Sequence, residues 1–198
     1  MCIRDRHRTT ACLVGCGLGT SREAQKLVEY LLARSKAPMV IDADGLNAIA
    51  AEPEMLSKAQ APLVLTPHPG EMARLLKTTV QDVQRHRLEY AKEFAVKQRL
   101  VLVLKGNKTV VACPDGKVYI NTTGNPGMAK AGSGDVLAGI TGAFAAKRQC
   151  EKNEKKISLA KTAALAAYAH GKAGEAAEEK SSASYVTASE IIRGLQSI

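Results

Sequence analysis

A glycine-rich stretch with a carboxylate at its end is the part of the sequence best suited to chemistry. It runs from Thr122 to Gly134, and Asp135 follows it at the start of an apolar segment predicted to be a helix over 135–147. Gly132 and Gly134 permit a bare turn whose N–H groups, with the positive end of the helix dipole, form an anion hole for phosphate. A carboxylate beside such a hole takes the proton from an attacking hydroxyl, as phosphoryl-transfer enzymes require.

Asp135 has a simpler interpretation as the N-cap of that helix, where the dipole favours a carboxylate by roughly 0.3–1 kcal/mol. A cap needs no run of glycines before it, which favours the phosphate site. The stretch is not a Walker loop, since Gly-Lys-Ser/Thr does not follow. A second cluster, Val14-Gly-Cys-Gly-Leu-Gly-Thr20, lacks the dinucleotide-fingerprint spacing and either admits a ligand or forms a tight turn.

Several polar residues follow predicted strands, where parallel sheets bind ligands. Asp42 and Asp44 are either site residues or turn formers, and Asn47 is a turn or cap residue. His68 lies between two prolines, in a rigid exposed turn that favours a site role. Lys105 ends a strand and precedes a glycine, which indicates a ligand loop. Three histidines have no partner in the sequence and are assigned to surface or core: His7, His86 and His170.

Predicted strands and helices alternate along most of the chain, which is typical of an α/β fold with a mostly parallel sheet covered on both faces. The strands are expected at 11–16, 38–43, 62–66 and 100–104, with a β-hairpin from 108–113 and 117–121 around Pro114-Asp-Gly116. The helices are expected at 21–35, 46–51, 71–77, 79–98, 135–147 and 157–178, with a last helix opening at Thr187.

Side-chain patterns set the expected helix starts and buried faces. Capping pairs are expected at Thr20 with Glu23, Thr79 with Asp82, and Thr187 with Glu190. Leu27 and Leu88 are expected on buried helix faces together with Ala24, Val28, Leu31, Leu32, Val83, Ala91 and Phe94.

Composition narrows the function classes. The chain has 198 residues, 45% of them hydrophobic, and a net charge of +9. The basic residues are dispersed and form no stripe with aromatic residues, which argues against nucleic-acid binding. They predict either a solvated surface, with a basic loop at 152–156, or a positive field for an anionic nucleotide. No apolar run reaches the roughly 18 residues of a membrane span.

The cysteines indicate the redox environment of the protein, and the first residues indicate its domain boundaries. The cysteines are scattered, without metal-site spacing, which favours a reduced cytoplasmic setting in which they are small buried hydrophobes or bystanders: Cys2, Cys12, Cys16, Cys113 and Cys150. Residues 1–8 are polar and are expected to be a non-native or disordered flank. Residues 9–198 are expected to form one domain whose fold begins further upstream.

Four sequence motifs resemble those of one protein family, and they follow one another along the chain in the same order as in that family. They are Ile41-Asp-Ala-Asp-Gly-Leu-Asn47, Leu65-Thr-Pro-His-Pro-Gly-Glu71, Leu104-Lys-Gly-Asn-Lys-Thr109, and the segment from Asn125-Pro-Gly-Met-Ala to Gly-Asp-Val-Leu-Ala-Gly139. Together they are similar to the ADP/ATP-dependent NAD(P)H-hydrate dehydratases of the ribokinase-like superfamily. The resemblance implies a three-layer α/β/α fold that is incomplete at the N-terminus.

The resemblance also implies a reaction and roles. These carbon–oxygen lyases phosphorylate the hydroxyl of the S-epimer of hydrated NADH or NADPH from ADP or ATP, with Mg²⁺, and then eliminate phosphate. By resemblance, Asp135 is the base, His68 and Gly17 or Gly19 contact the hydrate, and Glu71 supports magnesium without ligating it directly. The nucleotide contacts are expected at Lys105, Gly106, Asn107, Lys108 and Thr109, with Gly132, Ser133 and Gly134 forming the anion hole.

Two other functions remain open from the sequence. A vitamin-precursor kinase of the same fold would share the base and the anion hole, although the strings around His68 and Asp42 argue against it. An inactive nucleotide-binding fragment would bind ADP without turnover. The family resemblance further implies a homo-oligomer, with no nucleic-acid or membrane partner.

Overall fold

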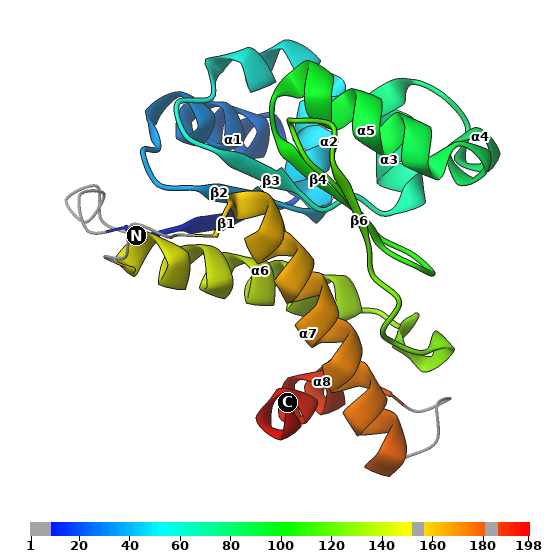
Figure 1. Ribbon diagram of the computed structural model, residues 1–198. Coiled ribbons are helices and arrows are strands. Elements are labelled where there is room, and N and C mark those ends of the chain that lie inside the picture. Colours follow the sequence, from blue (N-terminus) through cyan, green and yellow to red (C-terminus); the bar gives the residue numbers. More distant parts are fainter. Residues whose placement is uncertain (1–8, 152–156, 181–185) are drawn as a thin grey trace.

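The computed structural model describes residues 9–151, 157–180 and 186–198, and a six-stranded sheet lies at its centre (Figure 1). The expectations for residues 1–8 and 152–156 therefore lie outside the described residues. The strands are β1 (Cys12–Val14), β2 (Met39–Ile41), β3 (Leu63–Leu65), β4 (Val101–Leu104), β5 (Val110–Ala112) and β6 (Val118–Ile120).

The strand order in the sheet follows the chain. Strands β1 to β4 pair in parallel, whereas β4, β5 and β6 pair antiparallel. The predicted hairpin and the mostly parallel sheet are thus confirmed. Because parallel strands end at the same edge, the segments after Val14, Ile41, Leu65 and Leu104 gather there.

Helices cover both faces of this sheet, as the α/β pattern predicted (Figure 1). The α-helices are α1 (Arg22–Arg34), α2 (Ala43–Ala51), α3 (Pro69–Leu76), α4 (Val80–Arg85), α5 (Arg87–Gln98), α6 (Ser133–Cys150), α7 (Leu159–Lys180) and α8 (Ala188–Gly194). Short 3₁₀ helices are η2 (Pro53–Lys58), η3 (Pro126–Met128) and η5 (Leu195–Ser197). None of the helices in the described ranges combines the length and apolarity that crossing a bilayer requires.

The two faces of the sheet build two separate cores because side chains alternate along a strand. In β2, Met39 and Ile41 pack with α1, α2, α3 and α5, whereas Val40 points to the opposite face. On that second face, the small residues Ala163 and Ala167 of α7 pack against the valines of the central strands. The N-terminal end of α6 and the middle of α7 are thereby held over the carboxyl edge of the sheet.

Several helix starts differ from the sequence expectations, by up to three residues at α2, which begins at Ala43 rather than at residue 46. Ser21, not Thr20, caps α1: it has extended backbone geometry, and its Oγ accepts the N–H of Ala24 at 3.2 Å. The α6 helix begins at Ser133 and not at Asp135, since Gly132 occupies the N-cap position. The expected capping box of Thr187 and Glu190 is confirmed at α8.

The single helix expected over 79–98 is two helices. Thr79 caps α4 as predicted, but His86 leaves helical geometry, with φ −117° and ψ 31°, and α5 starts after it. Two of the expected buried residues are wrong: the side chains of Leu27 and Leu88 are 43% and 49% exposed. The spacing of apolar residues identified the buried faces of α1 and α5 correctly, and these two leucines lie at the edges of those faces.

Candidate active site

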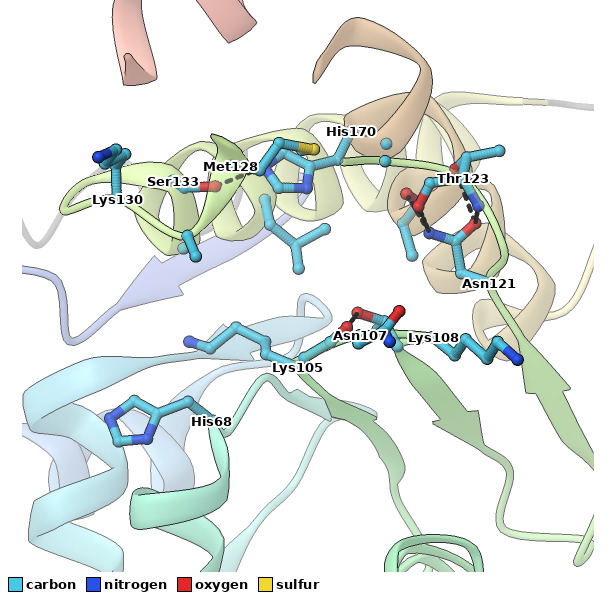
Figure 2. Close-up of a pocket in the computed structure, with 18 of the residues that line it drawn as sticks. His68, Lys105, Asn107, Lys108, Asn121, Thr123, Met128, Lys130, Ser133 and His170 are labelled. Atoms are coloured by element: carbon cyan, nitrogen blue, oxygen red, sulfur yellow. Dashed lines mark hydrogen bonds between the residues drawn. The ribbon is translucent and has the colours of Figure 1, made fainter. Parts of the chain in front are cut away.

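A cavity of about 790 Å³ opens at the carboxyl edge of the sheet. Figure 2 shows His68, Lys105, Asn107 and Lys108 on the sheet side, facing Ser133, Met128 and His170 across the space. The sheet side comprises Asp42, Ala43, His68, Pro69, Glu71 and residues 105–109, and the opposite side comprises residues 121–126, 128–130, 132–135 and 137, together with Ala167, His170 and Gly171. Most of the predicted site residues therefore share one cavity.

The turn before α6 has the geometry expected of an anion hole. Gly132 is the N-cap with φ 84°, a left-handed conformation that glycine adopts without strain. Ser133, Gly134 and Asp135 form the first turn, where an α-helix leaves its N–H groups without intrahelical partners. Because Asp135 is the third residue of the helix, the N-cap interpretation of this carboxylate is wrong; Asp135 is exposed and lines the cavity.

Three charged side chains meet on the sheet side of that turn. Lys105 Nζ lies 2.5 Å from Asp42 Oδ1 and 3.7 Å from Glu71 Oε2. The carboxylates of Asp42 and Glu71 are 1% and 6% exposed, so the lysine supplies the cation that two buried carboxylates need. An alanine Cβ at Gly134 would lie 3.3 Å from Lys105 Nζ, which places this ammonium next to the anion-hole turn.

His68 and Glu71 together start α3. His68 Nδ1 accepts the N–H groups of Gly70 and Glu71, and Glu71 Oε2 accepts the N–H of His68 at 2.7 Å. The histidine is thus an N-cap in a capping box rather than a residue of a free turn, although its side chain remains 50% exposed on the cavity wall. The other ring nitrogen, Nε2, lies 3.4 Å from Glu71 Oε1.

Cys16 is the residue of the first glycine cluster that lies next to the carboxylates of the site. Ligand atoms of Cys16, Asp42 and Asp135 lie within 4.8 Å of one another. Cys16 is exposed beside Asp135, so the expectation that it is a buried hydrophobe is wrong. Partial desolvation of the thiol, the hydrogen bond and charge of Asp135, and the charge of Asp42 raise the pKa of Cys16 to about 12, so the thiol stays protonated.

Gly17 and Gly19 lie in the same turn but do not line the cavity. The N–H of Gly19 donates to Asp44 Oδ2 at 2.8 Å, and Asp44 Oδ1 accepts from Asn47 Nδ2. Asp44 and Asn47 are residues of α2, so the turn or cap interpretation of Asn47 is wrong, whereas Asp42 is the N-cap of α2 and lines the cavity. At the start of this turn only glycine fits at position 15, because an alanine Cβ there would lie 1.8 Å from the Asp42 carbonyl oxygen.

The segment Lys105–Thr109, here called the 105–109 loop, lies along the cavity as predicted. Its backbone is unusual: Gly106 has φ 138° and Lys108 has φ 55°. Thr109 Oγ1 donates to the carbonyl oxygen of Gly106 at 3.1 Å, and the N–H of Lys105 donates to that of Pro67. The loop thus presents its backbone and lysine side chains to the cavity.

His170 is a cavity residue that the sequence analysis missed. Its Nε2 lies 3.3 Å from Ser133 Oγ, and burial lowers the pKa of the imidazole to about 4, so the ring is neutral (Figure 2). The available signal was its spacing, since His170 follows Ala163 and Ala167 on one face of α7. That spacing identifies a buried position but not its partner.

The segment after β6 contains the glycine-rich stretch assigned to the site from the sequence, but the contacts of its two asparagines were not predicted. Asn121 Nδ2 donates to the carbonyl oxygens of Thr123 and Ala167, and Asn125 Nδ2 donates to that of Gly174. Asn125 Oδ1 is buried and has no hydrogen-bond partner within the described residues. This oxygen remains available to a donor from a ligand.

The carboxylates of the site suit a hard divalent cation. Asp42, Glu71 and Asp135 contribute three carboxylates, and Lys105 pairs with the first two of them. Oxygen donors with excess negative charge are the environment that Mg²⁺ prefers. The thiol of Cys16 does not fit this donor set, because it is soft and protonated.

Comparison with known proteins gives a consistent result. The sequence profile of the NAD(P)H-hydrate dehydratase family matches residues 1–197. The bifunctional NAD(P)H-hydrate repair enzyme of Moorella thermoacetica is 51% identical over 83% of this chain and 29% of its own length. The ADP-dependent (S)-NAD(P)H-hydrate dehydratase of Neisseria meningitidis is 41% identical over 89% of this chain and 58% of its own length.

A solved structure of a relative shows that the similarity holds for the fold as well as for the sequence. The ADP/ATP-dependent NAD(P)H-hydrate dehydratase of Bacillus subtilis, co-crystallized with ATP/Mg²⁺ and soaked with CoA, has a TM-score of 0.79 and 34% identity. It is matched over 95% of this chain and 64% of that chain. The present chain therefore spans less than two thirds of the length of each of these relatives.

Proposed function

The chain belongs to the NAD(P)H-hydrate dehydratase family, and from that premise we propose that it dehydrates the S-epimer of hydrated NADH or NADPH at the expense of ADP or ATP. The observation that carries the proposal is the convergence of Asp135, the first-turn amides of α6 and the ammonium of Lys105 on one cavity. A base, a set of amide donors and a cation are the parts that phosphoryl transfer to a hydroxyl requires.

In the first step, Asp135 takes the proton from the hydroxyl of the hydrate. The hydroxyl oxygen attacks the terminal phosphorus of the nucleotide, and the bond from that phosphorus to the bridging oxygen breaks, which releases AMP from ADP or ADP from ATP. The N–H groups of Gly134 and Asp135 hold the transferring phosphoryl oxygens, while Lys105 offsets their charge.

In the second step, phosphate is the leaving group that hydroxide cannot be. The carbon–oxygen bond breaks with its electron pair going to phosphate, and a proton leaves the adjacent carbon. The new carbon–carbon double bond restores the dihydronicotinamide ring. A kinase-type site thereby performs a lyase reaction, with the nucleotide consumed stoichiometrically.

Residues of the cavity wall provide positions for the nucleotide and for the magnesium ion. The 105–109 loop and the turn at Gly132, Ser133 and Gly134 hold the nucleotide. Asn125 Oδ1 accepts a hydrogen bond from one of the two substrates. Mg²⁺, when bound, neutralises phosphate charge. Asp42 and Asp135 would hold the ion, and Glu71, which pairs with Lys105, would support it without ligating it.

The hydrate occupies the end of the cavity near His68 and Asp135, with Gly17 and Gly19 at its margin. We further propose that residues 9–198 form one domain and that the protein is a homo-oligomer. We also propose that it works in a reduced cytoplasmic setting. The setting is supported by the thiols of Cys12, Cys16, Cys113 and Cys150, which are all unpaired.

The test is a product balance. The chain is mixed with hydrated NADH, ADP and Mg²⁺, and dihydronicotinamide absorbance, phosphate and AMP are followed together. We expect all three to appear in equal amounts. A stable phosphorylated product without recovered dihydronicotinamide would identify a kinase, and ADP binding without any product would identify an inactive nucleotide-binding chain.

A further inference from the structure

Arg87 contacts the 105–109 loop without lining the cavity. Its Nη2 donates to the carbonyl oxygen of Leu104 at 3.3 Å and to that of Lys105 at 3.4 Å. Its guanidinium also covers Gly106, because an alanine Cβ at that glycine would lie 2.8 Å from Nη1. One side chain on α5 thus contacts three consecutive residues where β4 ends and the loop begins.

Holding this point matters because the loop has a strained conformation. Gly106 and Lys108 both have positive φ, and a non-glycine residue there loses about 1 kcal/mol or more relative to ordinary geometry. Such conformations persist where neighbouring contacts determine them. Arg87 fixes the carbonyl of Lys105 while Asp42 holds its ammonium, so both ends of this residue are positioned.

The position of Arg87 is unfavourable for the helix that carries it. Arg87 is the first residue of α5, where the helix dipole disfavours a positive charge. Burial lowers the pKa of the guanidinium, which means that the charged form is penalised there too. Both effects act against an arginine at this point, and the two carbonyl hydrogen bonds are the contacts that offset them.

We propose that Arg87 is a positioning residue for nucleotide binding, which fixes the 105–109 loop in the conformation that receives ADP or ATP. This inference rests on the nucleotide-binding role proposed for the loop. A guanidinium is suited to the task, because Nη2 donates to both carbonyls while Nη1 lies over the bare backbone of Gly106. A lysine has one side-chain nitrogen, so it would lack the second group that covers Gly106.

The experiment compares the full chain with Arg87→Met, Arg87→Lys and the control Arg85→Met. Arg85 ends α4 and is exposed, so its replacement removes a nearby positive charge without touching the loop. By calorimetry we expect ADP to bind about tenfold more weakly to R87M, about threefold more weakly to R87K, and unchanged to R85M. Equal affinity of R87M and the unmodified chain would overturn the proposal.

Hydrogen exchange of the amides separates positioning from general stability. We expect faster exchange at 106–109 in R87M and R87K, with exchange in β4 and the rest of α5 unchanged. A uniform increase across β4 and α5 would show that Arg87 only stabilises the fold, and would overturn the inference. If the unmodified chain fails to bind ADP, the proposed function fails, while loop exchange still decides whether Arg87 holds the loop.

Discussion

Lys105 Nζ lies 2.5 Å from Asp42 Oδ1, and this ion pair joins the carboxyl ends of β4 and β2 across 63 positions of sequence. The pair lies at the base of the cavity, beside Gly134 of the anion-hole turn. In the proposed reaction, an ammonium held there by a buried carboxylate would already be in place for the transferring phosphate. Such preorganised charge stabilises a transition state without reorganisation during the reaction.

Removing Lys105 should destabilise the fold strongly. Lys105→Ala leaves Asp42 and Glu71 buried without their cation, and breaking a buried pair in this way costs about 3–5 kcal/mol. The double variant Asp42→Asn with Lys105→Gln should recover at least half of that loss. Urea unfolding measures both, with the exposed cavity residue Lys130→Ala as a control expected within about 0.5 kcal/mol. A loss below about 1 kcal/mol for Lys105→Ala would contradict a tightly coupled pair.

Cys16 should be unreactive although it is exposed. Only the thiolate reacts with alkylating reagents, and a pKa of about 12 leaves very little thiolate near neutral pH. We expect alkylation of Cys16 in the folded chain to be at least about a hundredfold slower than in the denatured chain. Asp135→Asn removes a hydrogen bond and a charge that raise this pKa, so Cys16 should react several-fold faster in that variant. Unchanged reactivity, measured by peptide mass spectrometry, would show that the two side chains do not interact.

His170 should make the fold sensitive to mild acid. Burial lowers its pKa from 6.5 to about 4, so between these values the unfolded chain binds the proton and the folded chain does not. Its contribution to stability is therefore complete above about pH 6.5 and is lost as pH falls toward 4, by up to about 3 kcal/mol. The free energy of unfolding of His170→Gln should depend less on pH in this window. Parallel pH profiles for the two proteins would refute the assignment.

Two glycines on neighbouring helices should respond in opposite ways to alanine. An alanine Cβ at Gly171 of α7 would lie 2.1 Å from Thr123 Oγ1, so Gly171→Ala displaces the cavity wall and should destabilise by about 1–3 kcal/mol. Gly139 of α6 has open space at the same position, and Gly139→Ala should stabilise by up to about 1 kcal/mol. Thermal unfolding compares them. Equal shifts of the same sign would show that α7 does not pack against Thr123 as described.

The sequence was sufficient to predict the sheet and the edge where the site lies. Alternating strands and helices imply parallel strands whose carboxyl ends meet, and this brings Asp135 and Lys105 to one cavity. Local chemistry also predicted the Thr187 capping box and the hairpin, because turns and caps depend on residues close in sequence.

Contacts between distant segments were out of reach. The break at His86 was missed although the contacts across it are short-range: Thr78 and Tyr90 both donate to Asp82 Oδ2, and the apolar spacing over 79–98 does not show this. The break places Arg87 at the start of α5, facing β4. His170 was missed because its partner Ser133 lies 37 positions away.

The most direct test of the central claim is single-turnover dehydration of hydrated NADH by the unmodified chain and by Asp135→Asn, with ADP affinity measured alongside. Loss of the base should slow formation of dihydronicotinamide at least about a hundredfold while ADP binds within about threefold of the unmodified chain. If Asp135→Asn turns over at nearly the unmodified rate, Asp135 is not the base and the proposed chemistry at the α6 turn is wrong.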